Sequence, residues 1–153
     1  MISAGCIAGY GYKIMFTSFD MNDILFRVLS ASEELKTAIS GEIYSGDRPD
    51  NSEKEDITID TITVSNDMPQ KGTSNINIHM PDKYKNFKGQ EQREINEDRL
   101  KYLTDIIISI LETARVEGLS FWVANQTVLK EPEINQHYTK LRIEWNISKT
   151  NNN

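Results

Sequence analysis

The sequence predicts an α+β fold: a mainly antiparallel β-sheet with a long α-helix and N-terminal helices packed on one face. Three observations lead to this prediction. Residues 94–114 contain no Gly or Pro and carry apolar residues at helical spacing. Strand-like segments precede this helix at residues 57–80, and others follow it at residues 119–147. One hairpin before the helix and one after it give an α+β sandwich with a single sheet.

The length and charge of the chain limit its organisation. It has 153 residues and a formal net charge of −6, and this length predicts one domain. We expect a flexible N-terminal arm at residues 1–19, the α+β domain at residues 20–147 and a disordered polar tail at residues 148–153. Met15 is an alternative to Met1 as the true start. No apolar run approaches the roughly 20 residues that cross a membrane.

Two helices are predicted before the first strand. Asp20 can cap a helix over residues 21–31, whose apolar residues recur at helical spacing. Ser32, followed by two glutamates, begins a second capping signature, and this short helix ends at residues 40–41. A brief extended piece follows at residues 43–44, between two glycines.

The strands differ in how regularly apolar residues alternate. In residues 57–64 the parity of the apolar positions changes, which predicts a bulge near Asp60 and Thr61. Residues 73–80 complete the first hairpin, and residues 119–129 begin the second. The last strand alternates most cleanly. Its residues predicted to face inward are Thr139, Leu141, Ile143, Trp145 and Ile147.

Three loops connect these elements. The first loop spans residues 46–56. Its polar part, residues 50–56, is dense in charge and turn formers, so we expect that part to be exposed and mobile. Residues 81–93 form a polar connection that is long for a compact domain, and such loops are often functional or disordered. Residues 130–136 contain Pro132 and form the tip of the second hairpin.

No arrangement of residues predicts catalysis. His79 and His137 have no Cys or His partner at metal-ligand spacing, and we expect both to be solvated or hydrogen-bonded. A nucleophile elbow and a P-loop are both absent from the sequence. The single cysteine, Cys6, excludes an internal disulfide and lies in the predicted arm. We therefore expect a protein that is not an enzyme and that uses no metal and no cofactor.

The segment KYKNFK at residues 83–88 interleaves basic and aromatic side chains. Such a cluster could touch single-stranded nucleic acid. The chain as a whole is acidic, and a duplex-DNA binder would concentrate basic residues for the phosphates. A contact loop for a protein partner is therefore the better interpretation of this segment.

The chain resembles the tail-completion proteins of long-tailed phages and prophages, also called tail terminators or head–tail joining proteins. The resemblance rests on a helix that ends in Ile39-Ser40-Gly41, the strand start Ile43-Tyr44, and the loop glycine and proline Gly46 and Pro49. The later order of strand pair, amphipathic helix and strand pair also matches. The resemblance covers residues 20–147 and transfers no catalytic residue to this chain.

The resemblance implies a ring, usually a hexamer, at the head-proximal end of the virion tail, assembled in the host cytoplasm. Such a ring ends polymerisation of the tail tube and contacts the tail-tube protein and the head connector protein. DNA would pass through its lumen without specific binding, and an acidic wall that repels phosphate suits this passage. The residues expected to contact neighbouring subunits or partners are Asp47, Arg48, Glu53, Lys54, Lys83, Tyr84, Phe87, Lys88, Glu131 and Glu133.

Two alternatives remain open. Head-closure, tail-tube and other minor tail components are built from similar small subunits, and sequence separates them poorly. A small ligand-binding or hydrolytic α+β domain is the other alternative. It would need a concave pocket that holds His79 or His137 beside a carboxylate.

Overall fold

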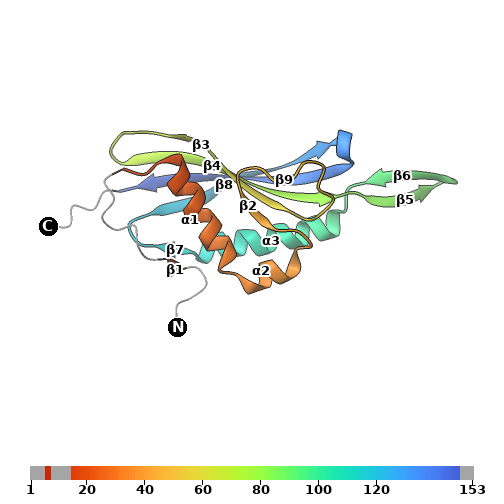
Figure 1. Ribbon diagram of the computed structural model, residues 1–153, viewed down its shortest axis with the longest axis horizontal. Coiled ribbons are helices and arrows are strands. Elements are labelled where there is room, and N and C mark those ends of the chain that lie inside the picture. Colours follow the sequence, from red (N-terminus) through yellow and green to blue (C-terminus); the bar gives the residue numbers. More distant parts are fainter. Residues whose placement is uncertain (1–5, 8–14, 149–153) are drawn as a thin grey trace.

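The computed structural model describes residues 6–7 and 15–148 and confirms the predicted α+β class (Figure 1). The elements, in chain order, are β1 (Cys6–Ile7), α1 (Ser18–Ser30), α2 (Glu33–Ala38), β2 (Ile43–Ser45), β3 (Ile57–Val64), β4 (Gln70–Pro81), β5 (Lys83–Phe87), β6 (Gln90–Glu94), α3 (Glu97–Thr113), β7 (Arg115–Val116), β8 (Ser120–Glu131), the 3₁₀ turn η1 (Pro132–Ile134) and β9 (Gln136–Ile147).

Five strands form the main sheet in the order β2-β3-β4-β9-β8, and only β2 and β3 run parallel. The helices α1 and α3 pack against one face of this sheet, and α2 lies beside α3 (Figure 1). Two small pairs complete the fold: β1 with β7 in parallel, and β5 with β6 in antiparallel.

The core lies between the sheet and the two longer helices. The residues of β9 that were predicted to face inward are all buried, which confirms that prediction. On the helix side, Leu25 and Val28 of α1 meet Leu103 and Ile107 of α3 in the same apolar cluster. Burying each such side chain stabilises the fold by roughly 1.5–3 kcal/mol. The α3 helix therefore holds the sheet by its apolar stripe, as its sequence predicted.

The start of α1 corrects the prediction. The N-cap is Thr17, and Asp20 is the third helical residue of a capping box. The Thr17 Oγ1 accepts from the Asp20 backbone N–H at 3.2 Å, and the Asp20 carboxylate accepts from the Thr17 N–H at 2.7 Å. Phe16 is buried, and its backbone bonds the Gln70 side chain at both N–H and C=O. The domain thus begins before residue 20.

Part of the predicted arm and tail lies outside the described residues. These are residues 1–5, 8–14 and 149–153. Within the arm, the backbone of β1 pairs with that of β7.

The strand predictions hold with one exception. The register of β3 against β4 shifts between Thr61 and Thr63, close to the predicted bulge. The prediction of a loop over residues 81–93 is wrong, because β5 and β6 form a regular antiparallel hairpin there. Its strands lack the alternation of apolar residues on which strand prediction depends, since neither strand has a buried face.

Candidate assembly surface

The three predicted contact segments meet at one end of the sheet. The loop from β2 to β3, the start of β5 and the turn between β8 and β9 all lie where β4 ends (Figure 1). Arg48 Nη2 donates to Gln136 Oε1 at 2.9 Å, and Gln136 Nε2 donates to the Ser52 carbonyl at 2.5 Å. The Asp82 N–H donates to the Asn135 carbonyl at 2.9 Å. We call this region, residues 46–56, 82–94 and 131–137, the assembly end.

The loop at residues 46–56 is held by buried charge. Asp56 is only 1% exposed, and its carboxylate accepts from the Glu42 N–H at 3.1 Å and from the Ser52 hydroxyl at 2.5 Å. The Arg48 guanidinium, itself nearly buried, lies 3.3 Å from the same carboxylate. The expectation of an exposed loop over residues 50–56 is therefore wrong for Asp56. Burying a carboxylate is costly unless it is paired, and Arg48 of the same loop provides that pair.

A second ion pair ties this loop to the helices. The Arg99 Nε on α3 donates to Glu55 Oε2 at 2.7 Å, and Nη2 donates to Glu55 Oε1 at 3.0 Å. The same guanidinium also bonds the Ala38 carbonyl at the end of α2. Two-pronged pairing of this kind fixes geometry as well as charge. The remaining contact candidates in this loop, Asp47, Glu53 and Lys54, are exposed.

The β5–β6 hairpin projects from the body as an arm, defined here as residues 83–94 (Figure 1). Every residue of β5 and all but Glu94 of β6 are exposed. At its tip, Lys88 and Gly89 both have positive φ, at 51° and 80°. Such a two-residue turn matches the twist of paired strands. The Asn86 side chain closes the turn by accepting from the Gly89 N–H at 3.1 Å.

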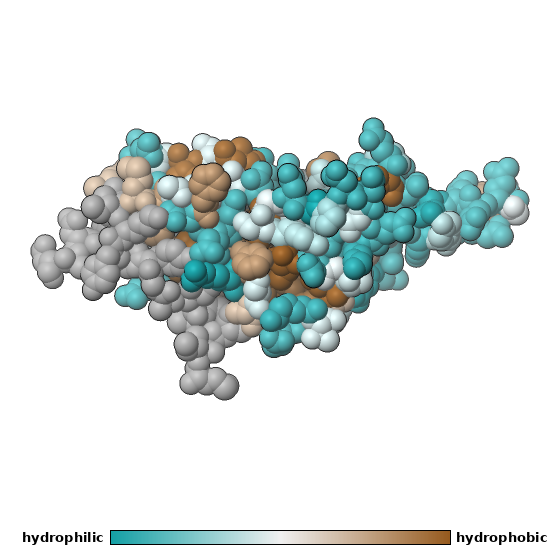
Figure 2. All heavy atoms as spheres, viewed as in Figure 1, coloured by the Kyte–Doolittle hydropathy of each residue, from teal (hydrophilic) through white to brown (hydrophobic). Residues whose placement is uncertain are grey.

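The arm carries its own cross-strand contacts. The Arg93 guanidinium stacks 3.8 Å from the centre of the Tyr84 ring. Lys83 and Lys85 both lie within 3.6 Å of the Glu94 carboxylate. The surface of the arm is mostly hydrophilic in Figure 2. Tyr84 is 62% exposed and Phe87 52% exposed, so both rings remain available to another molecule.

The base of the arm is fixed to the body. Asp82 is buried, and its carboxylate lies 2.6 Å from the His137 Nδ1 at the start of β9. Its backbone N–H bonds the η1 turn, as described above. Sequence reasoning missed Asp82 and Gln136. Their partners lie 53 to 88 residues away along the chain, so no local pattern marks them.

The last two contact candidates lie at the turn between β8 and β9, and they differ in their exposure to solvent. Glu133 is exposed. Glu131 is half-buried, and its carboxylate lies 3.2 Å from His79 Nδ1. Thr58 Oγ1 lies 3.1 Å from His79 Nε2, so both ring nitrogens are engaged. Burial, and then the nearby Arg48 charge, lower the pKa of His79 to about 4, although Asp56 opposes them. His79 is therefore neutral at pH 7.

A depression of about 460 Å³ lies beside this histidine, on the sheet face opposite the helices. Its lining residues are Gly46, Asp47, Arg48, Asp50, Thr58, Asp60, Asn77 and His79. Among the residues that the structure describes, no three His, Cys, Asp or Glu side chains are grouped so as to hold a metal ion. Within the same residues, no helix is long and apolar enough to span a membrane.

Comparison with protein-family models finds no match for this chain, and comparison with curated protein sequences finds none either.

Proposed function

We propose that this protein is a structural subunit of a phage tail. In this proposal, copies of the chain form a ring that caps the tail tube, ends its polymerisation and joins the tail to the head connector. DNA passes through the lumen without specific binding. The observation that carries the proposal is the assembly end, where three separate chain segments form one continuous surface with a projecting arm.

The arm supports a role in assembly. A two-stranded hairpin without a packed face is marginally stable in water. This arm nevertheless presents Tyr84 and Phe87 to solvent, and aromatic side chains are enriched in protein interfaces. Its base is fixed by Asp82 and His137, so the arm points in a defined direction. A contact with another subunit would bury these rings and thereby stabilise the arm.

The alternatives receive less support. A head-closure or other minor tail component would use the same assembly end, so the experiment below must separate the two. A ligand-binding domain would use the depression beside His79. Both ring nitrogens of that histidine are already engaged by Glu131 and Thr58, so the histidine offers no free nitrogen to a ligand.

The test is deletion of this gene from the phage or prophage that encodes it, followed by electron microscopy of lysates. We expect DNA-filled heads without tails, together with free tails of abnormal length. Heads that have lost their DNA would instead indicate a head-closure protein. Normal virions in normal numbers would contradict both phage assignments.

Complementation sharpens this test. The wild-type gene should restore virions, whereas a gene with Tyr84→Ser and Phe87→Ser in the arm should not. Met68→Ser provides the matched control, because Met68 is 70% exposed in the turn between β3 and β4, at the opposite end of the sheet (Figure 1). If the arm variant restored virions as well as the wild-type gene does, the function would not depend on the assembly end.

A further inference from the structure

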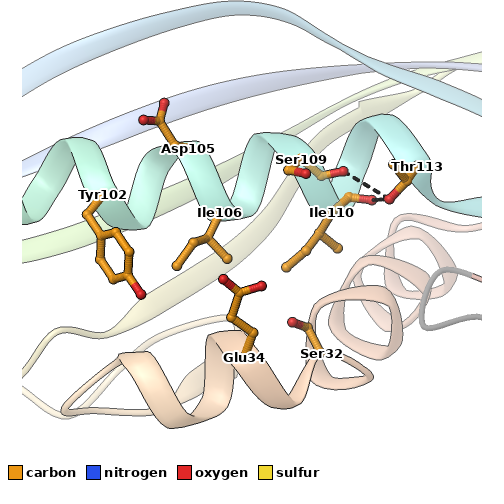
Figure 3. A pocket seen from close by; sticks show the side chains of 8 residues that line it. All are labelled: Ser32, Glu34, Tyr102, Asp105, Ile106, Ser109, Ile110 and Thr113. Carbon is orange, nitrogen blue, oxygen red and sulfur yellow. Dashed lines mark hydrogen bonds between the residues drawn. The ribbon is translucent and has the colours of Figure 1, made fainter.

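A groove separates α2 from α3 on the helical side of the molecule (Figure 3). It encloses about 450 Å³ and is lined by Ser32, Glu34, Tyr102, Asp105, Ile106, Ser109, Ile110 and Thr113. Figure 3 shows Tyr102, Ile106 and Ile110 directed from α3 toward α2, and Glu34 directed from α2 toward α3. A second hollow, of about 360 Å³, adjoins it at Glu34 and Tyr102. The groove thus combines an apolar floor with a polar edge.

The charge of the groove is negative. Glu33, Glu34 and Asp105 line the two hollows, and among the described residues no Lys or Arg does. Lys36 neutralises Glu33 at 2.9 Å, and Lys101 neutralises Asp105 at 2.5 Å. In the part of the chain that the structure describes, the Glu34 carboxylate makes no ion pair or hydrogen bond. A bound segment that carries a cation and an apolar ring would pair with the Glu34 carboxylate and pack on the apolar floor.

The arm has the complementary composition. In a chain of net charge −6, residues 83–94 carry four cations against two carboxylates. Lys88, at the tip, lies 5.7 Å from the centre of the Phe87 ring and forms no ion pair with any described carboxylate. The tip therefore offers one unpaired cation beside an exposed ring. The groove offers one unpaired carboxylate beside Tyr102, which is 47% exposed, and the half-buried Ile110.

The arm does not reach the groove of its own chain. In Figure 1 it extends away from α2 along the long axis of the molecule. The donor therefore has to be another copy.

We propose that the arm of one copy docks in the α2–α3 groove of the next copy. Lys88 then faces Glu34, and the ring of Phe87, which lies on the opposite face of β5 from Tyr84, packs on Tyr102 and Ile110. This inference rests on the proposed function and names the contact that builds the ring. Because the two surfaces differ, the contact is head-to-tail, and such contacts close into rings when the rotation permits.

The test uses two charge reversals in the full-length chain, Lys88→Glu and Glu34→Lys, with sedimentation velocity as the readout. Each variant alone juxtaposes like charges at the contact, which disfavours docking. We expect its self-association to weaken about tenfold or more. In an equimolar mixture, the reversed arm of one variant can meet the reversed groove of the other, and the two unchanged surfaces can also meet. The mixture should therefore associate as the wild type does.

Lys71→Glu and Asp67→Lys are the matched controls, because both residues are exposed, lie at the β3–β4 turn and belong to neither the arm, the groove nor the assembly end. They should associate normally. Failure of the mixture to recover, or equal weakening by the controls, would overturn the proposed contact. So would a wild-type chain that stays monomeric at roughly millimolar concentration. The gene-deletion phenotype does not depend on this contact, so it tests the function separately.

Discussion

The β8–β9 hairpin and the β5–β6 arm have the same local structure and opposite surroundings. In β9, alternate residues are buried against α1 and α3, whereas β5 and β6 are exposed on both faces. Packing on the helices stabilises the first hairpin. The second depends on its turn and on cross-strand pairs, each worth roughly 0.2–1 kcal/mol. The arm is thus able to change in sequence with little effect on the fold, which suits a surface for contacts.

The largest expected effect is in the core hairpin. Trp145 is 1% exposed, packs 4.9 Å from the Phe121 ring and donates its Nε1–H to Ser74 at 2.9 Å. Trp145→Ala should lower the free energy of unfolding by about 3–5 kcal/mol, because it leaves a cavity and removes a buried hydrogen bond. Urea denaturation measures this. The control is Trp122→Ala on β8, where the ring is 47% exposed. Equal losses would contradict the comparison.

The next effect concerns the loop that sequence patterning describes as exposed. Asp56→Ala removes the carboxylate that pairs with Arg48 and accepts from Glu42 and Ser52. Removing one partner of a buried pair costs about 3 kcal/mol or more. Asp47→Ala, in the exposed part of the same loop, should cost less than about 0.5 kcal/mol. Denaturation midpoints of the two variants check this. A small loss at Asp56 would mean that the loop is not held by this pair.

A smaller effect depends on pH. The pKa of His79 is about 4 in the folded protein, below its ordinary value of 6.5, so the unfolded chain binds a proton that the folded chain rejects. Stability from this group is full above pH 6.5 and falls as the pH falls toward 4, by up to about 3 kcal/mol. Denaturation across this range, compared with His79→Gln, isolates the contribution. An unchanged pH dependence in that variant would contradict it.

The sequence predicts those elements in which the surroundings of each residue follow from its neighbours along the chain. The alternation in β9 and the helical spacing in α3 state directly which side chains are buried. The arm has no such pattern, because none of its strand faces meets a core. The burial of Arg48 was also not predictable, since it depends on Gln136, 88 residues later. Composition did suggest the loop and the arm as candidate contact regions, without showing that they share one end of the sheet.

The smallest expected effect on stability is in the arm itself. Phe87 is exposed, and the only ring contact it makes among the described residues is with the Lys88 ammonium. Phe87→Ala should therefore change the free energy of unfolding by less than about 0.5 kcal/mol, as exposed substitutions usually do. Thermal and urea denaturation of the isolated chain measure this at concentrations low enough to prevent association. A loss as large as that of Trp145→Ala would show that the arm belongs to the folded core. A negligible loss, with weaker self-association at higher concentration, would separate the residues that build the fold from those that build contacts.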